Sequence, residues 1–440
     1  MNYNNFFAEA KNQGVEALEL YVVKNKKFSF SLFNHEINSY SVADSFVITA
    51  RGIINGKMGY ASTEKVDKDT PKFIIQKIKE NAEFITSDDE SIIFKGSEKY
   101  FKKNLFSKAL EMTSENDKIA LVKELSNGLA LKDNRIYNIE AEYEEETNEI
   151  LLINSYGLKL SSKGNYCYIY LAGFANDDKG ETKSGYDLKI LTDLASLNKE
   201  EFIGKAAHKI ISQLGSEPCL TGVYKAVFNP SCTASLLRFF LDNTYAQQVQ
   251  KNTSLLKDKL NKQVASNKVT ISENPLTKNV FFRYFDDEGV ATKNKKIVDK
   301  GELKTFIYNL STAKKDNVET TGNGYKGNGK IHTSLVNVTL KPGKKSEEEL
   351  FEKVGEGIYI TSLQGLHAGM NAQSGNFSLQ SQGFMIRDGK LAEPVSLITV
   401  AGNLFNLFMD IVEVGSNIEL QPSSYSVPSI MVKKINVSGK

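Results

Sequence analysis

The sequence carries almost no excess charge of either sign. Its 440 residues include 55 Lys and Arg and 53 Asp and Glu, which gives a formal net charge of +2. A protein that binds nucleic acid directly usually carries clustered basic residues that neutralise phosphates. The charge balance therefore predicts no nucleic-acid partner.

Long apolar runs and abundant cysteine are missing as well. No uncharged apolar stretch approaches the roughly 20 residues that a membrane-spanning helix needs, and the first residues lack the basic and apolar regions of a secretory signal. Cys167, Cys219 and Cys232 form no C-x-x-C motif and cannot all pair with one another. We therefore expect a cytoplasmic protein of a reducing compartment that does not bind membranes.

Closely spaced histidines, a common sign of a zinc site, are also absent. His35, His208, His332 and His367 show neither H-x-x-x-H nor H-E-x-x-H spacing. A zinc site needs three or four nitrogen, sulfur or oxygen donors, so these histidines are expected to be surface or structural residues. No motif ties a serine to a histidine base either, and we expect no catalytic residue.

What is present indicates a two-domain α+β protein. A length of 440 residues exceeds what one core usually organises. A polar helix near residues 200–214 leads into a Gly-Ser-Glu-Pro turn, where we place the domain boundary. The predicted domains are residues 1–215, with strands and flanking helices, and residues 216–440, mostly β and closed into a barrel-like or sandwich core.

In the first domain, alternating apolar residues and turn signals predict a series of strands and helices. Asn55-Gly56 predicts a tight hairpin, and Ser114 followed by Asp117 resembles the capping box that starts a helix. Residues 139–153 are predicted to form two strands that turn near Thr147-Asn148.

The second domain reads as short strands separated by glycine-rich turns. Strands are predicted at residues 223–228, 280–284, 302–308, 334–340, 357–363, 397–401 and 429–437. Two helices are predicted, one after Asn229-Pro230 and one at residues 346–354. Asp286, Asp287 and Glu288 lie in a predicted hairpin turn, so we expect solvated carboxylates rather than an acid/base site.

The most informative stretch is residues 365–383, which we call the signature loop. It reads G-x-x-x-G and then S-G-N-F-S, and is followed by G-F-x-I-x-D-G, Pro-Val and Ala-Gly-Asn. Glycines allow backbone to approach another surface closely or to adopt a positive φ, as we expect for Gly375, whereas Phe377 is expected to pack beneath the loop. The candidates for contact with a peptide or a partner chain are Gly365, Gly369, Ser374, Gly375, Phe377, Ser378 and Gly383.

This pattern resembles the C-terminal signature of the TldD/PmbA family, and in particular its PmbA (TldE) branch, historically called modulators of DNA gyrase. Weaker matches at residues 51–63, 285–292 and 320–323 extend the resemblance from about residue 15 to residue 438. The signature loop is the most specific part of the match.

The resemblance also locates where a zinc motif would stand. TldD-type chains carry H-E-x-x-x-H in the first helix of their second half, and the matching positions here hold Arg238, Phe239 and Asn243. An arginine cannot lose its proton to bind zinc, and a phenylalanine cannot activate a water. We therefore expect no metal and no cofactor in this chain, with zinc only in a TldD-type partner.

The resemblance implies a non-catalytic subunit of a zinc metallopeptidase system that cleaves peptides or unfolded proteins. Such a subunit would complete a chamber with a TldD-like zinc-bearing chain and hold an extended substrate, for example by strand addition. The alternative is a stand-alone homodimeric peptide-binding module, or pseudoenzyme, without a TldD-type partner. Whether the chain is itself an enzyme stays open at this point.

Overall fold

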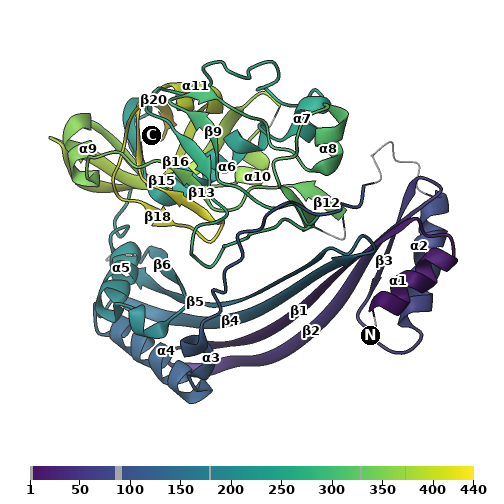
Figure 1. Ribbon diagram of the computed structural model, residues 1–440. Helices are drawn as coiled ribbons and strands as arrows, with labels where there is room; N and C mark the ends of the chain where they lie inside the picture. The colour runs from purple at the N-terminus through teal and green to yellow at the C-terminus, as the bar shows by residue number, and fades with distance from the viewer. Residues whose placement is uncertain (1–2, 85–91, 178–179, 328–329, 372) are drawn as a thin grey trace.

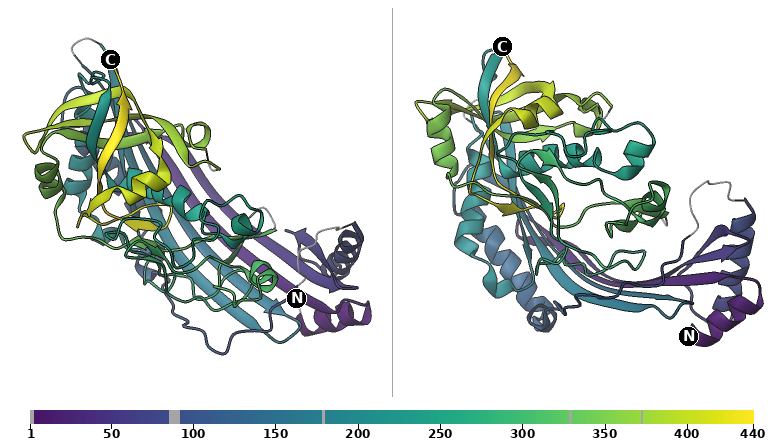
Figure 2. Two further views of the ribbon diagram at one scale, coloured as in Figure 1. Left: turned by 90° about the horizontal axis from the view of Figure 1, so that it is seen from above. Right: turned by 45° about the horizontal axis from the view of Figure 1, so that its top comes forward.

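The chain consists of an N-terminal half built on one long curved sheet and a C-terminal half that lies over one face of that sheet (Figure 1). A computed structural model describes all residues except 1–2, 85–91, 178–179, 328–329 and 372. Seen from above, the end of the sheet that carries the first two helices extends beyond the C-terminal half (Figure 2).

The N-terminal sheet is antiparallel throughout, with strand order β3-β2-β1-β4-β5-β6. Its strands are β1 (Ala17–Phe33), β2 (Glu36–Ile54), β3 (Lys57–Thr63), β4 (Ile136–Asn154), β5 (Lys159–Asn176) and β6 (Thr182–Leu191). The four longest strands have 17 to 19 residues. At about 3.4 Å per residue they span roughly 60 Å.

Two turn predictions for this sheet have opposite outcomes. Asn55 (φ 49°) and Gly56 (φ 72°) form the predicted tight turn between β2 and β3. The turn predicted at Thr147-Asn148 is wrong, because β4 runs through it without interruption. Thr147 pairs with Lys26 on one side and with Asn165 on the other, so ladders on both edges override a weak local turn signal.

Helices cover the face of the sheet that points away from the C-terminal half. They are α1 (Tyr3–Asn12) and α2 (Thr70–Phe84) at one end, and α3 (Lys108–Met112), α4 (Glu115–Ala130) and α5 (Lys199–Ile211) at the other. The predicted cap of α4 is confirmed, since the Ser114 hydroxyl accepts a hydrogen bond from the Asp117 N–H at 3.1 Å. Val122 and Leu125 of this helix are fully buried in a cluster with Tyr143 of β4.

Five strands of the C-terminal half close into a barrel. They are β7 (Gly222–Phe228), β14 (Gly357–Gln364), β15 (Asn376–Arg387), β16 (Lys390–Asn403) and β20 (Ile430–Ser438). Their order is β16-β15-β14-β7-β20, and pairing of β16 with β20 completes the ring, while β17 (Ile411–Val414) extends β20. The predicted α+β class with a barrel-like second half is confirmed.

A second sheet and several short helices surround the barrel. The sheet has the order β10-β9-β8-β13-β19-β18, with β8 (Ile271–Glu273), β9 (Lys295–Asp299), β10 (Glu302–Leu303), β13 (Val338–Leu340), β18 (Glu419–Leu420) and β19 (Tyr425–Val427). A separate hairpin joins β11 (Gly324–Gly327) to β12 (Lys330–Thr333). The helices are α6 (Pro230–Asp242), α7 (Ala246–Gln250), α8 (Leu310–Lys315), α9 (Glu347–Val354), α10 (Leu366–Gly369) and α11 (Leu404–Met409). None of the described helices is long and apolar enough to cross a bilayer.

Most of the predicted elements of this half exist, but one strand does not. Residues 280–284 form turns and loop, and of 302–308 and 334–340 only the short strands β10 and β13 remain. Tyr284 is 2% exposed and packs with Leu152 and Leu160 of the N-terminal sheet. The apolar pattern of 280–284 therefore reflects burial between the halves rather than a ladder of backbone hydrogen bonds.

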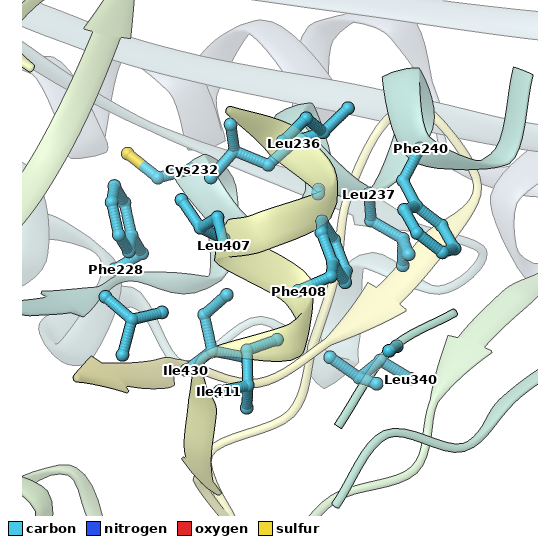
Figure 3. Packing of buried hydrophobic residues seen from close by; sticks show 14 of the residues in the cluster. Phe228, Cys232, Leu236, Leu237, Phe240, Leu340, Leu407, Phe408, Ile411 and Ile430 are labelled. Carbon is cyan, nitrogen blue, oxygen red and sulfur yellow. The ribbon is translucent and has the colours of Figure 1, made fainter. Parts of the chain in front are cut away.

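The barrel core is closed by α6 and α11 (Figure 3). Leu236, Leu237 and Phe240 of α6 face Leu407 and Phe408 of α11, and the rings of Phe240 and Phe408 stack with centroids 4.5 Å apart. Full burial of each such side chain contributes about 1.5–3 kcal/mol. This packing fixes α6, the helix on which a zinc motif would stand.

The halves also meet away from Tyr284, at the far end of the N-terminal sheet. Gln213, which follows α5, donates from Nε2 to the Gly383 carbonyl at 3.1 Å, and the Ser216 and Ser396 hydroxyls lie 2.8 Å apart. The C-terminal half is therefore attached to the same sheet at two separate places. The domain boundary at residue 215 lies beside this second attachment and stays a prediction.

Candidate functional site

Helix α6 begins as its sequence predicts. The Asn229 side chain accepts a hydrogen bond from the Cys232 N–H at 2.8 Å, and Pro230 occupies the first turn, where its missing N–H costs nothing. The apolar side of the helix is buried, so the positions of Arg238, Phe239 and Asn243 are well determined by packing.

The side chains at these three positions do not fit a zinc ion. Asn243 donates from Nδ2 to the Phe239 carbonyl at 3.1 Å and accepts at Oδ1 from the Leu255 N–H at 3.0 Å, so both ends of its amide are occupied. Phe239 packs against the barrel core, and Arg238 is exposed with no lone pair to offer. Among the described residues, no group of three or more His, Cys, Asp and Glu side chains is arranged to hold a metal.

One ionisable group on α6 was not anticipated from the sequence. Burial raises the pKa of Asp242 to about 6, while the charge of Arg238 and a hydrogen bond from Tyr245 lower it again. A single carboxyl beside an arginine can bind a proton near neutral pH. It cannot replace the three or four donors of a zinc site.

The signature loop is held in shape by two asparagines. Asn371 accepts at Oδ1 from the N–H groups of Gln373 (3.0 Å) and Ser374 (2.9 Å), and its carbonyl accepts from the Gly375 N–H at 2.8 Å. Asn403 donates from Nδ2 to the Ser374 carbonyl at 2.9 Å. The Ala-Gly-Asn motif that ends β16 therefore braces the loop from the neighbouring strand.

Three glycines of the loop are explained by contacts within the chain, and a fourth, Gly365, by its backbone conformation. Gly375 has φ +72°, and a β-carbon there would lie 2.9 Å from Phe405 Cδ2, so both predicted reasons for glycine apply. Gly369 and Gly383 pass so close to the carbonyls of Ser378 and Tyr359 that a β-carbon would overlap them. Gly365 has φ +73° with open space around it.

The structure brings only some of the residues predicted to contact a peptide or a partner chain close together. Ser374 lines a hollow of about 370 Å³ between the loop and residues 255–264, with Asn403, Phe405 and Met409 beside it. Phe377 is 4% exposed beneath the loop, as predicted, whereas Ser378 is exposed on β15. Gly383 lies at an irregular pairing of β14 with β15 next to Gln213, far along the strand from the hollow.

Phe405 connects the hollow to α6. Its ring centroid lies 5.4 Å from that of Phe240 and its edge covers Gly375. A larger groove of about 680 Å³ lies on the helix-covered face of the N-terminal sheet and is lined by none of the predicted residues. The hollow beside the signature loop is therefore the cavity that adjoins a predicted contact residue, Ser374.

A cluster of buried charges between the halves was missed from the sequence. The prediction that Asp286, Asp287 and Glu288 are solvated is wrong, since their exposed fractions are 0%, 5% and 4%. We call these residues, together with Arg51, Glu19, Tyr21, Arg283 and Lys326, the seam.

Each carboxylate of the seam faces a different way and finds its own partners. Asp286 accepts from the backbone N–H groups of Glu288, Val290 and Gly324 at 2.9–3.0 Å. Glu288 accepts from the Leu310 N–H at 2.9 Å and lies 3.8 Å from Arg51 Nη1. Buried carboxylates are tolerated only when they are hydrogen-bonded in this way.

Two contacts of the seam cross from one half to the other, that of Tyr21 with Asp287 and that of Arg51 with Glu288. The Tyr21 hydroxyl donates to Asp287 at 2.7 Å, and Arg283 forms an ion pair with the same carboxylate. Arg51 donates from Nε to Glu19 at 3.0 Å while its guanidinium also faces Glu288. The docking of the C-terminal half on this end of the sheet is therefore polar as well as apolar.

The pKa values of the seam follow from its burial. Burial raises the pKa of Asp286 and of Glu288, with the Arg51 charge opposing the rise for Glu288. Burial lowers the pKa of Lys326 to about 7. Lys326 Nζ is out of contact with solvent, lies 3.8 Å from the centre of the Tyr21 ring, and has no hydrogen-bond partner among the described residues.

A signal for the seam was present in the sequence. Arg51 and residues 285–290 both lie in the short motifs that carry the weaker part of the family resemblance. Their distance of more than two hundred positions along the chain concealed that they meet.

Comparison with known proteins places the chain in a family. Three domain profiles described as PmbA/TldA metallopeptidase match successive parts of it: domain 1 at residues 18–82, the central domain at 108–214 and the C-terminal domain at 221–439. The chain belongs to the PmbA/TldD family. The first two PmbA/TldD domains together build the single N-terminal sheet, and the third contains the barrel.

Individual members of the PmbA/TldD family resemble the chain over different lengths. The metalloprotease PmbA homolog of Buchnera aphidicola subsp. Baizongia pistaciae is 34% identical over 264 residues, which cover 60% of this chain but only 57% of that relative. A Thermotoga maritima protein described as a modulator of DNA gyrase is 30% identical, with a TM-score of 0.91 and 99% of both chains covered. TldE of Thermococcus kodakarensis shares the fold at 22% identity, with a TM-score of 0.91 over 99% of this chain and 100% of that one.

Proposed function

We propose that this PmbA/TldD family member is a non-catalytic, metal-free subunit of a zinc metallopeptidase system that cleaves peptides or unfolded proteins. The observation that carries the proposal is the set of side chains on α6, where Arg238 and the hydrogen-bonded Asn243 stand in the place of the two zinc-binding histidines and Phe239 in the place of the general-base glutamate. Zinc and the activated water would come from a TldD-type partner. A cytoplasmic location is part of the proposal and fits the free thiols of the three cysteines.

The hollow beside the signature loop would hold part of an extended substrate. Its wall combines the Phe405 ring with the exposed Ser374 and the half-buried Asn403, so it suits an apolar side chain next to peptide backbone. Strand addition at β15 itself is excluded, because β15 is already paired with β14 and β16. The substrate would therefore be held by the loop and the hollow rather than by a new strand of the barrel.

Metal content and activity of the purified chain, alone and with a TldD-type partner, test the proposal. The chain alone is expected to contain no stoichiometric zinc and to show no chelator-sensitive peptidase activity, whereas the pair should show both. About one zinc per chain in the isolated protein, with activity that a chelator removes, would refute the metal-free assignment.

A second candidate is a stand-alone homodimeric peptide-binding module. The observation that favours it is the outer edge of β2, where residues 36–47 pair with β1 on one side and with no strand of the described chain on the other. Copurification discriminates between the two. A zinc-bearing partner of similar size supports the subunit, and a stable homodimer that ignores such a partner supports the module.

A further inference from the structure

The larger groove, on the helix-covered face of the N-terminal sheet, lies between two groups of helices. These groups, α1 with α2 and α3 with α4 and α5, lie at opposite ends of the sheet (Figure 1). The groove is lined by Tyr3 of α1 on one side and by Lys102, Lys103 and Phe106, which precede α3, on the other. Its volume of about 680 Å³ falls within the range of about 300–1,000 Å³ that is typical of ligand-binding sites. We call it the basic groove.

Two adjacent rows of side chains, each crossing four strands, form the floor of the basic groove. In the first row, directly opposite one another on neighbouring strands, are Phe46 of β2, Lys24 of β1, Glu149 of β4 and Lys163 of β5. In the second row, in the same strand order, are Ile48, Val22, Leu151 and Ser161. The floor therefore offers an apolar row beside a charged one.

The wall at the edge of β5 is a segment of chain held to the sheet by hydrogen bonds. β6 pairs with β5 only from Cys167 onward, so the segment before α3 can approach the earlier part of β5. The Ser107 N–H donates to Asn165 Oδ1 at 2.6 Å, and Asn165 Nδ2 donates to the Ser107 carbonyl at 2.9 Å. Lys102 Nζ also donates to the Ser161 hydroxyl at 3.4 Å. These bonds hold the two lysines of the segment at the rim of the groove.

The positive charges of the basic groove are not balanced within the described part of the chain. Among the described lining residues Glu149 is the only carboxylate, and it forms an ion pair with Lys163 at 3.0 Å. No ion pair joins Lys24, Lys102 or Lys103 to a carboxylate of the described residues. Three amines without a counter-charge beside an apolar row favour an anionic ligand that also has an apolar part.

We propose that the basic groove binds an acidic segment of another polypeptide, with an apolar side chain on the apolar row and carboxylates against Lys24, Lys102 and Lys103. A bound carboxylate would also relieve a repulsion at the rim, where contact with the ammonium group of Lys278 lowers the pKa of Lys103. The groove lies on the face of the sheet that points away from the C-terminal half. This binding is therefore independent of the proposed peptidase role.

The aromatic rings of the groove favour a peptide over a single-stranded nucleic acid. Nucleic-acid single strands bind by stacking their bases on open aromatic faces. Here Lys163 Nζ lies 4.2 Å from the centre of the Phe106 ring, and Lys24 Nζ lies 5.9 Å from that of Phe46. Because an ammonium group already covers each ring, the groove offers charge and apolar surface rather than a stacking platform.

The depth of the apolar row favours a peptide over a lipid surface. Proteins that bind membranes insert apolar side chains that protrude from their surface. Val22 and Ile48 are only 4% and 1% exposed and belong to the floor of the groove. A side chain of an extended peptide can reach this floor, whereas a flat bilayer would meet the lysines at the rim first.

The test is the binding of a short fluorescent peptide, in which glutamates flank a central Leu-Phe pair, to the full chain, measured by anisotropy. Lys24→Glu with Lys103→Glu is expected to weaken binding about tenfold or more. Val66→Ser, which shortens a lining side chain that is 44% exposed, should weaken it about threefold. Lys341→Glu with Lys344→Glu is the matched control, because it makes the same change of charge at exposed lysines of the C-terminal half and should stay within about twofold of the parent.

Thermal melts of each variant separate loss of binding from loss of folding. A peptide with glutamine in place of each glutamate should bind more weakly, and added salt should weaken binding of the acidic peptide. The proposal is overturned if the parent does not bind the acidic peptide, if the glutamine peptide binds equally well, or if the two double variants lose equal affinity. Tighter binding of a thymidine oligonucleotide or of anionic phospholipid vesicles, abolished by Lys24→Glu with Lys103→Glu, would assign the groove to that polyanion and overturn the peptide.

Discussion

The signature loop and the seam are opposite kinds of structure. The loop is uncharged, exposed on one side and held by hydrogen bonds from Asn371 within the loop and from Asn403 on the adjacent strand. The seam is charged and buried, and is held by contacts such as that of Tyr21 with Asp287, 266 positions apart. The loop carried the clearest pattern in the sequence, and the seam carried almost none.

The difference between the loop and the seam matches two different tasks, binding another molecule and joining the two halves of the chain. A surface that receives a peptide or a partner needs polar groups that remain available and a backbone that is already in place, which the loop provides. A joint between two halves needs groups whose bonds are all used inside the protein, and the carboxylates of Asp286 and Glu288 are used in this way. Changes in the seam should therefore act on stability first, and changes in the loop on binding.

The largest effect is expected from Arg51→Met in the seam. The variant leaves Glu19 and Glu288 buried without their cation, and an unpaired buried charge typically costs about 3–5 kcal/mol. Urea unfolding should show this loss. Arg387→Met is the control, because Arg387 is half exposed beside Glu356 and Glu393 and should lose less than about 1 kcal/mol. Equal losses for the two variants would contradict the distinction between the seam and an ordinary surface ion pair.

In the loop, Gly375→Val should both destabilise the turn and weaken binding. The new side chain meets a positive φ and the Phe405 ring, with an expected loss of about 1–3 kcal/mol. A pull-down with a TldD-type partner or a peptide, together with a thermal melt, measures both effects. Gly365→Val has the same sign of φ in open space and should lose only about 1 kcal/mol. If Gly375→Val folds and binds like the parent, the loop is only a structural turn.

Lys326→Met tests whether burying the charged amine of Lys326 in the seam lowers the stability of the folded protein. The folded-state pKa of about 7 lies below the ordinary 10.5, so at acidic pH the protein buries a charged amine in full. As the pH rises from about 7 to 10, the folded state loses the proton first and the parent gains stability relative to acidic pH. The variant should therefore exceed the parent in free energy of unfolding by about 1–3 kcal/mol at pH 6.

The excess in free energy of unfolding of Lys326→Met over the parent should shrink by pH 9.5. A difference between Lys326→Met and the parent that stays constant from pH 6 to 9.5, or grows with pH, would mean that the folded-state pKa of Lys326 is not lowered. Arg51→Met measured over the same range is the control, because the Arg51 guanidinium stays protonated throughout.

The smallest effect is expected from Ser378→Ala. The Ser378 side chain is exposed, and the backbone pairing of this residue with Ala401 on β16 does not depend on the hydroxyl. The free energy of unfolding should change by less than about 1 kcal/mol, and binding should change little. Loss of a hydrolytic activity of the isolated chain through this substitution alone would refute the non-catalytic assignment.

Local signals in the sequence predicted local structure well. The Asn55-Gly56 turn, the cap at Ser114 and the positive φ of Gly375 all depend on residues within a few positions of one another. The same reasoning failed at Thr147-Asn148, because the pairing of β4 with β1 and β5 decides that region.

The candidate functional site likewise has one part that local sequence signals predict and another part that they do not. The shape of the loop depends on its own glycines, on Asn371 and on Asn403 of the adjacent strand, and all of these lie in short motifs that can be recognised in the sequence. The burial of Asp287 depends on Tyr21 and Arg283, and no spacing rule connects residues 21 and 287. The hollow beside Ser374 was equally hidden, because residues 255–264 of its far wall carry no motif.

The two attachments of the C-terminal half have a mechanical consequence. One lies near Leu152 of β4, and the other lies near the start of that strand, where Ile210 of α5 packs beside Ile136 and Gly173. An extended strand of this length separates them by about 50 Å and can hardly stretch. The sheet is therefore an inextensible support for the C-terminal half, which is attached to it near both ends. Weakening one attachment, for instance by removing the Tyr21 hydroxyl that donates to Asp287, changes how the sheet can bend rather than how long it is.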